Sequence, residues 1–315
     1  MKVLLTRRIP SSVLSLLEAV HGVEIYDGPS PIPHDELMRR IAGKQALICL
    51  LTERIPADVI AASTLRVIAN IAVGYENIDL AAARARGVIV TNTPDVLTDA
   101  VAEFTWALIL AAARRLGEGE RLLRRGAWRG WTLDFLLGTQ LQGKQLGVIG
   151  IGRIGRAVAA KAPAFGMTVA FAKRGQPPFS LPEKAAVPLS MDELLTSSDV
   201  ITLHVPGGEA TRHMIDRKSL ARMKRSAILV NTSRGSVVDE EALAWALGEH
   251  LIAAAALDVY EHEPAVQAAL LAIDNVILAP HLGSATRETR TAMAALAVEN
   301  VLAVLSGQPA KTPVA

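Results

Sequence analysis

Between residues 2 and 94, short apolar runs alternate with segments whose apolar residues recur at helical spacing. The strand-like runs are KVLLT (2–6), QALICLL (45–51), LRVIANIAV (65–73) and VIVTNTP (88–94), and the helix-like segments are SVLSLLEAV (12–20) and AAARARG (81–87). Alternation of this kind is typical of βα units that build a parallel sheet.

The alternation begins again at Gln145, after a segment from about Thr98 to about Arg125 that predicts one long helix. Strands are then predicted at LGVIG (146–150), MTVAFA (167–172), VITLHVP (200–206), AILVNTS (227–233), LIAAAALDVY (251–260) and VILAP (276–280). Helices are predicted at 153–165, 191–199, 220–224, 240–250 and 287–307. The Pro-rich segment 175–188 is predicted to be a surface loop.

Two series of this kind predict an α/β protein with two doubly wound parallel-sheet domains. We place one domain at residues 1–97 and 285–315 and the other at 98–284, so that the closing helix returns to the first domain. The length of 315 residues and the hydrophobic share of 50% suffice for two cores of ordinary size.

Charge and cysteine content exclude several classes of protein. With 33 basic and 31 acidic residues, the net charge of +2 predicts neither nucleic acid nor an anionic membrane as partner. The single cysteine, Cys49, lies in an apolar run and cannot form an internal disulfide. The N-terminal MKVLLTRRIP lacks a signal-peptide core, and VAEFTWALILAAA (101–113) is too short to span a bilayer. We therefore expect a soluble, cytoplasmic protein.

Gly150, Gly152 and Gly155 form the pattern G-x-G-x-x-G between an apolar strand and a predicted helix. In that context the pattern predicts a dinucleotide-binding turn. The first glycine allows a tight turn, the second lets a pyrophosphate approach the backbone, and the third lets the helix pack on the strand. The N-terminus of the helix favours the phosphate charge. The alternative is a turn whose glycines serve the backbone only.

The strand that follows this turn ends in VAFAKR, with Lys173 and Arg174 where a site for NAD carries an acid. No carboxylate lies between Met167 and Pro182. An acid there would repel a 2′-phosphate, whereas the planar guanidinium of Arg174 matches one. We therefore expect NADP(H) to be preferred over NAD(H), although two solvated basic residues on a loop are the plainer alternative.

Three later segments place polar residues after predicted strands, where open α/β sheets bind their ligands. They are LVNTSRGSVVDEEAL with Arg234, ALDVYEHEP with Asp258 and Glu263, and ILAPHLGSAT with His281. Taken singly, each residue could be a surface ion-pair partner or a turn cap. By comparison, we expect His262 to be exposed and His204 to be structural. Zinc is not expected, because there is one cysteine and no H-E-x-x-H spacing.

Nearly the whole chain resembles the D-isomer-specific 2-hydroxyacid dehydrogenase family. The resemblance includes NIAVGYENIDL (70–80), TNTPDVLTDAVAE (91–103), HVPGGEATRHMI (204–215), the glycine turn and the three later segments. Within the family the chain is most similar to glyoxylate/hydroxypyruvate reductases, through PDVLTDAVAE, GAWRGWTLDFLLG and PHLGSAT. The resemblance implies a Rossmann-type cofactor domain at 98–284 and a flavodoxin-like substrate domain formed by the remaining residues.

The resemblance also implies roles for single residues. Arg234 would hold the carboxylate of a 2-oxo acid and polarise its carbonyl. His281 would be the general acid, and the Glu263 carboxylate would stabilise its protonated form. Substrate binding is expected to involve Leu51, Val73, Gly74, Arg234, His281, Ser284 and Trp131. Cofactor binding is expected to involve Thr98, Gly150, Gly152, Arg153, Ile154, Gly155, Lys173, Arg174, Val205, Pro206, Thr211, Thr232, Ser233, Arg234, Asp258, His281 and Gly283.

The activity that the resemblance implies is NADPH-dependent reduction of glyoxylate and hydroxypyruvate to glycolate and D-glycerate. A 2-ketogluconate reductase, another D-2-hydroxyacid dehydrogenase, or a non-catalytic NAD(P)-sensing partner protein remain alternatives. In similar reductases the loop that holds Trp131 reaches the neighbouring subunit. Trp131 could therefore line the partner's substrate pocket or only fill the interface, and we expect a homodimer.

Overall fold

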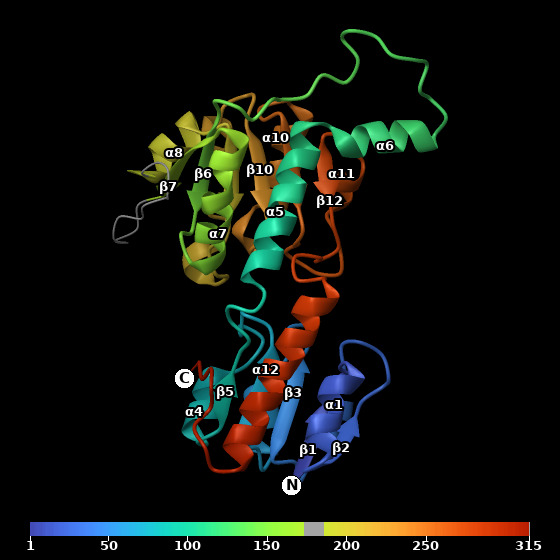
Figure 1. The fold of residues 1–315 in the computed structure, drawn as a ribbon, viewed down its shortest axis with the longest axis vertical. Helices are drawn as coiled ribbons and strands as arrows, with labels where there is room; N and C mark the ends of the chain where they lie inside the picture. Colours follow the sequence, from blue (N-terminus) through green and yellow to red (C-terminus); the bar gives the residue numbers. More distant parts are fainter. Residues whose placement is uncertain (173–185, 315) are drawn as a thin grey trace. The chain divides into compact units, whose positions relative to one another are not determined.

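The computed structural model describes residues 1–172 and 186–314 (Figure 1). Contacts divide the chain into a first unit, Met1–Leu97 with Ala285–Ala315, and a second unit, Thr98–Ser284. Each unit holds its own parallel sheet, so the predicted fold class, two doubly wound α/β sheets, is confirmed. The assignment of the substrate to one unit and of the cofactor to the other stays a prediction.

The first unit contains a five-stranded parallel sheet in the order β2-β1-β3-β4-β5, which is the flavodoxin-like order. Its strands are β1 (Lys2–Leu5), β2 (Gly22–Ile25), β3 (Ala46–Leu50), β4 (Val67–Ile71) and β5 (Ile89–Thr91). Its helices are α1 (Ser11–Glu18), α2 (His34–Ile41), α3 (Ala57–Ala61), α4 (Leu80–Ala85) and α12 (Arg287–Leu305).

Helices cover both faces of this sheet. Apolar side chains of α1 and α12 pack with Val3, Leu5 and Ile48 on one face. Helices α2, α3 and α4 pack with Leu4 and Leu47 on the other. Because neighbouring residues of a strand point to opposite faces, strands buried on both sides require continuous apolar runs. This requirement explains why β1, β3, β4 and β5 were visible in the sequence as hydrophobic segments.

The second unit contains a seven-stranded parallel sheet in the order β12-β11-β10-β9-β6-β7-β8. Its strands are β6 (Gln145–Ile149), β7 (Thr168–Ala172), β8 (Val187–Leu189), β9 (Val200–Leu203), β10 (Ile228–Asn231), β11 (Ala254–Leu257) and β12 (Val276–Leu278). Its α-helices are α5 (Thr98–Ala113), α6 (Leu116–Arg124), α7 (Arg153–Lys161), α8 (Met191–Ser197), α9 (Arg217–Arg222), α10 (Glu240–Gly248) and α11 (Ala268–Leu271). If β6 to β12 are numbered 1 to 7, the order read from β8 is 3-2-1-4-5-6-7. This is the Rossmann order 3-2-1-4-5-6 with one further strand at its end.

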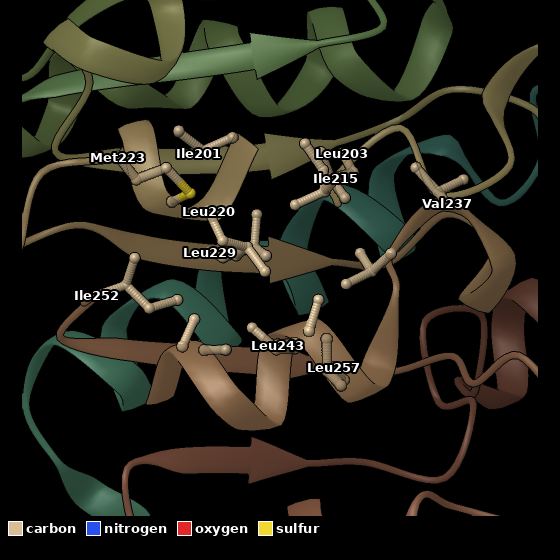
Figure 2. Close-up of a cluster of buried hydrophobic side chains, with 14 of the residues drawn as sticks. Ile201, Leu203, Ile215, Leu220, Met223, Leu229, Val237, Leu243, Ile252 and Leu257 are labelled. Atoms are coloured by element: carbon tan, nitrogen blue, oxygen red, sulfur yellow. The ribbon is translucent and has the colours of Figure 1, made fainter. Parts of the chain in front are cut away.

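Two cores lie on opposite faces of this sheet. Helices α5 and α7 pack on one face, where Val230 of β10 points. Helices α8, α9 and α10 pack on the other, where the neighbouring Leu229 points. Figure 2 shows part of this second core, with Leu220 and Leu243 from the helices lying against Leu229 and Leu257 from the strands.

The single long helix predicted from about Thr98 to Arg125 is wrong, because the structure divides it into α5 and α6. Arg115 has φ 51° and ψ 35°, a left-handed conformation that cannot continue a right-handed helix. Its guanidinium binds Glu118 on the first turn of α6, at 3.0 Å and 2.6 Å. The alanines, leucines and arginines of the segment favoured one continuous helix, although Gly117 and Gly119 follow the break closely.

The prediction of a surface loop at residues 175–188 is also wrong at its C-terminal end. Val187 and Pro188 belong to β8, which pairs with β7 at the edge of the sheet. Proline is compatible with an edge strand, because such a strand has an unpaired side. Residues 175–185 of the predicted loop lie outside the described residues. In the described chain, no helix is both long and apolar enough to cross a membrane.

Candidate active site

Five strands of the second unit, β6 and β9 to β12, end at one edge of its sheet, because all of its strand pairs are parallel. Each is followed by residues that the sequence singled out. They are Gly150 after β6, Val205 and Pro206 after β9, Thr232 to Arg234 after β10, Asp258 after β11, and His281 after β12. In open α/β sheets this edge is where ligands bind.

The glycines after β6 meet three different surroundings. Gly150 has φ 97°, and a Cβ there would lie 2.5 Å from the main-chain carbon of His204. A Cβ on Gly155 would lie 2.1 Å from the Gly150 oxygen, so the helix packs directly on the turn. Gly152, the N-cap of α7, has no atom within 4 Å of its Cβ position. The turn is thus closely packed at its first and third glycines and open at its second, which fits a bound pyrophosphate.

His281 and Glu263 form an ion pair, with Nδ1 of the ring 2.9 Å from Oε2 of the carboxylate. Burial works to raise the pKa of Glu263, but the hydrogen bond and charge of His281, the Tyr260 N–H and the charge of Arg234 together lower it. The carboxylate is therefore ionised at neutral pH and can accept a hydrogen bond from the ring's Nδ1–H. Among the described residues, the ring's Nε2 has no hydrogen-bond partner.

Asp258 fixes the main chain of His281 and of the two residues that follow it. Its Oδ1 accepts from the Leu282 N–H at 2.6 Å and its Oδ2 from the Gly283 N–H at 2.8 Å, while its carbonyl accepts from the His281 N–H at 2.9 Å. Burial raises the pKa of Asp258, although these two N–H groups and the charge of His281 oppose the rise. His281 itself has φ 55°, a left-handed conformation that is uncommon outside glycine. Such local strain is typical of functional positions.

The turn with Arg234 is shaped by Asn231, the last residue of β10. Its Oδ1 accepts from the N–H and hydroxyl of Ser233, and its Nδ2 donates to the carbonyl of Arg234 at 2.8 Å. Thr232 Oγ1 lies 2.9 Å from Thr105 Oγ1 on α5, which ties the same turn to the helix behind it. Asn231 is fully buried and was not among the predicted site residues.

Gly235 brings this turn against the one that holds Glu263. A Cβ on Gly235 would lie 1.8 Å from the main-chain carbon of Tyr260, so only glycine fits. Tyr260 donates its N–H to Glu263 Oε1 at 3.0 Å and its hydroxyl to the Ala279 carbonyl at 3.0 Å. Tyr260 therefore connects the glutamate turn to the strand end that leads to His281. It, too, was missed, because its role depends on partners distant in sequence.

Comparison with known proteins supports a family assignment. The family model of the D-isomer specific 2-hydroxyacid dehydrogenase NAD binding domain matches residues 106–283. Over 313 residues, the chain is 46% identical to a glyoxylate reductase from Aeropyrum pernix, covering 98% of this chain and 93% of that protein. The chain belongs to the D-isomer-specific 2-hydroxyacid dehydrogenase family. It is therefore an NAD(P)-dependent oxidoreductase that acts on CH–OH groups.

Solved structures resemble this dehydrogenase along its whole length. A crystal structure from Thermus thermophilus has a TM-score of 0.94 and 46% identity, and covers 100% of both chains. An NADPH-dependent glyoxylate/hydroxypyruvate reductase from Sinorhizobium meliloti, solved with NADP and malonate, has a TM-score of 0.86 and 35% identity. That alignment covers 100% of this chain and 96% of the reductase.

Several further residues expected to bind the cofactor lie at the same edge of the dehydrogenase's second sheet. Thr211 closes the loop after β9, because its hydroxyl donates to the Pro206 carbonyl at 2.7 Å. Arg153 and Ile154 begin α7, and Thr98 begins α5. Lys173 and Arg174, on which the expected cofactor preference depends, lie outside the described residues.

Of the residues expected to bind substrate, Leu51, Val73 and Gly74 lie in the first unit of the dehydrogenase. Leu51 follows β3, and Val73 and Gly74 follow β4, so both turns lie at the carboxyl ends of adjacent parallel strands. Asn77 connects them, since its Nδ2 donates to the carbonyls of Leu50 and Glu53, at 3.2 Å and 2.9 Å. Ser284 is the last residue of the second unit and is half-buried.

Trp131 belongs to an extended segment that follows α6 and projects from the rest of the second unit (Figure 1). Its exposed fraction is 77%, so it fills no pocket within its own unit. The predicted dimer relied in part on the apolar helix 101–113, but most of that helix is buried against its own sheet. The helix therefore gives no support to a dimer.

The two histidines without an expected role differ in their surroundings. His262 is exposed. His204 has its Nε2 2.9 Å from Thr202 Oγ1, and burial lowers its pKa to about 3, so its ring is neutral in the folded protein. In the described residues, no three His, Cys, Asp or Glu side chains are grouped so that they could hold a metal ion.

Proposed function

We propose that this dehydrogenase reduces small 2-oxo acids, glyoxylate and hydroxypyruvate, to glycolate and D-glycerate with NADPH as preferred hydride donor. The observation that carries the proposal is the His281–Glu263 pair at 2.9 Å, beside an arginine whose charge reaches Glu263. A cation for a carboxylate and a proton donor for a carbonyl oxygen are what reduction of a 2-oxo acid requires. The glyoxylate reductases among its relatives support the choice of substrate.

The turn after β6 fits a dinucleotide, because its open Gly152 leaves the backbone accessible at the N-terminus of a nine-residue helix. Gly150, Gly152, Gly155 and the start of α7 would hold the pyrophosphate. The nicotinamide supplies the hydride when it is bound. Val205, Pro206, Thr232, Ser233 and Asp258 would surround the rest of the cofactor.

The chain's own residues would then orient the 2-oxo acid and move one proton. Arg234 binds the carboxylate and polarises the carbonyl oxygen by charge-assisted hydrogen bonds. As the carbonyl carbon gains hydride and its π bond breaks, the Nε2–H of protonated His281 gives its proton to the oxygen. Glu263 holds the ring by Nδ1 and stabilises its positive charge until that transfer.

The first unit would supply the second anchor for the substrate carboxylate, through the main-chain N–H groups of Val73 and Gly74. Within the described chain, neither N–H donates to a protein acceptor. Unpaired N–H groups in a turn are suited to an anion. Leu51, on the adjacent turn after β3, would limit the size of the acid that fits there.

The preference for NADPH rests on sequence. Lys173 and Arg174 follow the strand where an acid would select NAD, and no carboxylate replaces it before Pro182. The S. meliloti reductase was solved with NADP, which agrees with a phosphate-accepting site in this part of the family.

We also propose that the protein is a homodimer built around the segment after α6. Five of its apolar residues are exposed, at 51% (Trp128), 77% (Trp131), 82% (Leu133), 38% (Phe135) and 65% (Leu137). Large exposed apolar residues gathered in one short segment are typical of interaction sites. Analytical ultracentrifugation should give twice the chain mass of 33.5 kDa, and Trp131→Asp should shift it toward the monomer.

A substrate panel tests the proposed activity. Initial rates of NADPH and NADH oxidation would be measured with glyoxylate, hydroxypyruvate, 2-ketogluconate and pyruvate. We expect the highest kcat/KM with glyoxylate or hydroxypyruvate and NADPH. No turnover with any of these acids would refute the proposed reductase activity. A clear preference for 2-ketogluconate would refute glyoxylate and hydroxypyruvate as the preferred substrates.

A further inference from the structure

The turn that follows β4 has three successive carbonyls held by other residues of the first unit. The Ala72 carbonyl accepts from the Thr93 N–H at 2.8 Å, and the Val73 carbonyl accepts from Asn92 Nδ2 at 2.8 Å. The Gly74 carbonyl accepts from Asn70 Nδ2, also at 2.8 Å. No other turn after a strand of this unit has side-chain amides on two consecutive carbonyls among the described residues.

Holding a carbonyl also aims the next N–H. In a trans peptide the C=O of one residue and the N–H of the next point in opposite directions, and the peptide plane is stiff. The bond from Thr93 therefore directs the Val73 N–H away from β5, and the bond from Asn92 directs the Gly74 N–H away from Asn92. Among the described residues, the Val73 and Gly74 N–H groups have no protein acceptor, and the peptide of each is fixed through its carbonyl.

Asn92 is itself held by the C-terminal segment. Its N–H donates to the Thr312 carbonyl at 3.3 Å, and its own carbonyl accepts from Thr312 Oγ1 at 2.6 Å. Thr312 Oγ1 also accepts from Asn300 Nδ2 on α12, at 2.9 Å, and Asn300 Oδ1 accepts from the Thr312 N–H at 3.0 Å. Asn300 is fully buried, so this chain of bonds connects the helix core to the turn.

The buried Asn70 is fixed in the same way on the other side of the turn. Its Nδ2 also donates to Asn77 Oδ1 at 3.0 Å, and its Oδ1 accepts from the Cys49 thiol at 3.5 Å. The amide of Asn70 therefore has its donors and acceptor engaged at once, which leaves it one orientation. A side chain held this firmly is suited to fixing a backbone group rather than to binding a ligand itself.

We propose that Asn92 is a positioning residue for the substrate carboxylate, acting through the peptide between Val73 and Gly74. It aims the Gly74 N–H at the carboxylate without touching the acid, and Asn70 supports the following peptide. The role rests on the proposed function, since it requires that Val73 and Gly74 bind a 2-oxo acid. A charge-assisted bond from a well-placed N–H contributes about tenfold to a hundredfold in affinity, which is lost when the peptide can rotate.

The test compares two variants of Asn92 with a matched control. Asn92→Asp keeps the shape but replaces the donor by an oxygen that repels the Val73 carbonyl. Asn92→Ala removes the donor without adding a charge. It can replace Asn92→Asp in the test if the Asn92→Asp protein does not fold. Asn275→Asp is the control, because Asn275 Nδ2 donates to the Ala253 carbonyl at 3.1 Å in the other unit, near the surface.

Steady-state kinetics with glyoxylate, inhibition by the unreactive analogue oxamate, and NADPH titration would be measured for each protein. We expect both Asn92 variants to raise the glyoxylate KM and the oxamate Ki by about tenfold or more, with the NADPH Kd unchanged and kcat reduced much less. Asn275→Asp should leave all four constants unchanged.

Two outcomes would overturn the role of Asn92. One is a KM and Ki within twofold of wild type in a folded variant. The other is a loss of kcat and melting temperature with KM unchanged, which would indicate a structural role only. Failure of the proposed function is seen separately, since the wild-type protein would then turn over no 2-oxo acid.

Discussion

The turn after β6 in the second unit and the turn after β4 in the first are both suited to anions, but they are built differently. The turn after β6 has its shape because its glycines lack side chains, and the close approach of Gly155 to Gly150 fixes it locally. The turn after β4 has its shape because Asn70 and Asn92 hold its carbonyls, and Asn92 lies nineteen residues from the residue it binds, Val73. A glycine turn is recognisable from a short motif, whereas a turn held by amides depends on the fold around it.

The largest effect is expected from Gly155→Ala. The added methyl would lie 2.1 Å from the Gly150 oxygen, so helix α7 has to move. We expect a loss of about 3 kcal/mol in the free energy of unfolding, at the upper end for overpacked cores, and no measurable NADPH binding. Urea denaturation and fluorescence titration measure the two quantities.

Gly152→Ala is the control for that substitution, because its methyl meets no atom within 4 Å and its φ of −72° suits alanine. Its unfolding free energy should stay within about 0.5 kcal/mol of wild type, while the NADPH Kd rises. Equal stability losses in the two variants would mean that Gly155 is not packed more closely than Gly152.

A smaller effect is expected from Thr312→Val, which weakens the amide-held turn from behind. It removes the hydroxyl that donates to the Asn92 carbonyl and accepts from Asn300. A loss of about 1–2 kcal/mol in unfolding free energy is expected, together with a raised glyoxylate KM. Thr196→Val is the control, since that hydroxyl bonds only to carbonyls of its own helix. If the Thr312 variant is destabilised but its glyoxylate KM is unchanged, the C-terminal segment does not influence substrate binding by the turn.

Arg174→Asp tests cofactor choice. Replacing the planar cation by an acid should lower the ratio of kcat/KM for NADPH to that for NADH by about tenfold or more. Arg225→Asp makes the same charge change at an exposed position before β10, at the opposite edge of the sheet. An unchanged ratio in the Arg174 variant, or an equal change in both, would count against the NADP assignment.

An effect confined to acid pH is expected at His204, whose main chain packs on the glycine turn. Its folded pKa of about 3 lies below the ordinary 6.5, so the unfolded chain binds the extra proton between these values. Stability contributed by the neutral ring is therefore present above pH 6.5 and is lost as the pH falls toward 3.

Replacing His204 by Gln should reduce the acid slope of unfolding free energy in that window by up to about 1.4 kcal/mol per pH unit. The exposed His262→Gln is the control. Chemical denaturation at several pH values measures the slopes. Identical slopes in the two variants would show that His204 is not neutralised by folding.

Much of the fold was predictable, because strands buried on both faces must be continuous apolar runs. The elements that were missed lack this signal. Strand β2 (GVEI) is only partly buried, and β8 contains Pro188. The break at Arg115 arises from a left-handed backbone conformation at a residue that is neither glycine nor proline, and the only local signal is Gly117 and Gly119 just beyond it.

The candidate site was predictable where it depends on strand ends and a local motif. The sequence placed His281, Glu263 and Arg234 after strands, and the structure brings the first two into contact. It did not indicate Asn231 or Tyr260, whose partners are main-chain groups brought near by folding. A polar residue at the end of an apolar strand, as in LVNTS, is the signal that could have revealed Asn231.

The role of His281 as general acid can be measured by single-turnover reduction of glyoxylate with His281→Ala and with His262→Ala, each preloaded with NADPH. We expect that loss of the proton donor slows hydride transfer by about 10²–10⁴-fold with the NADPH Kd unchanged, and that the exposed His262 variant matches wild type. A rate for the His281 variant within tenfold of wild type would contradict its role as the general acid.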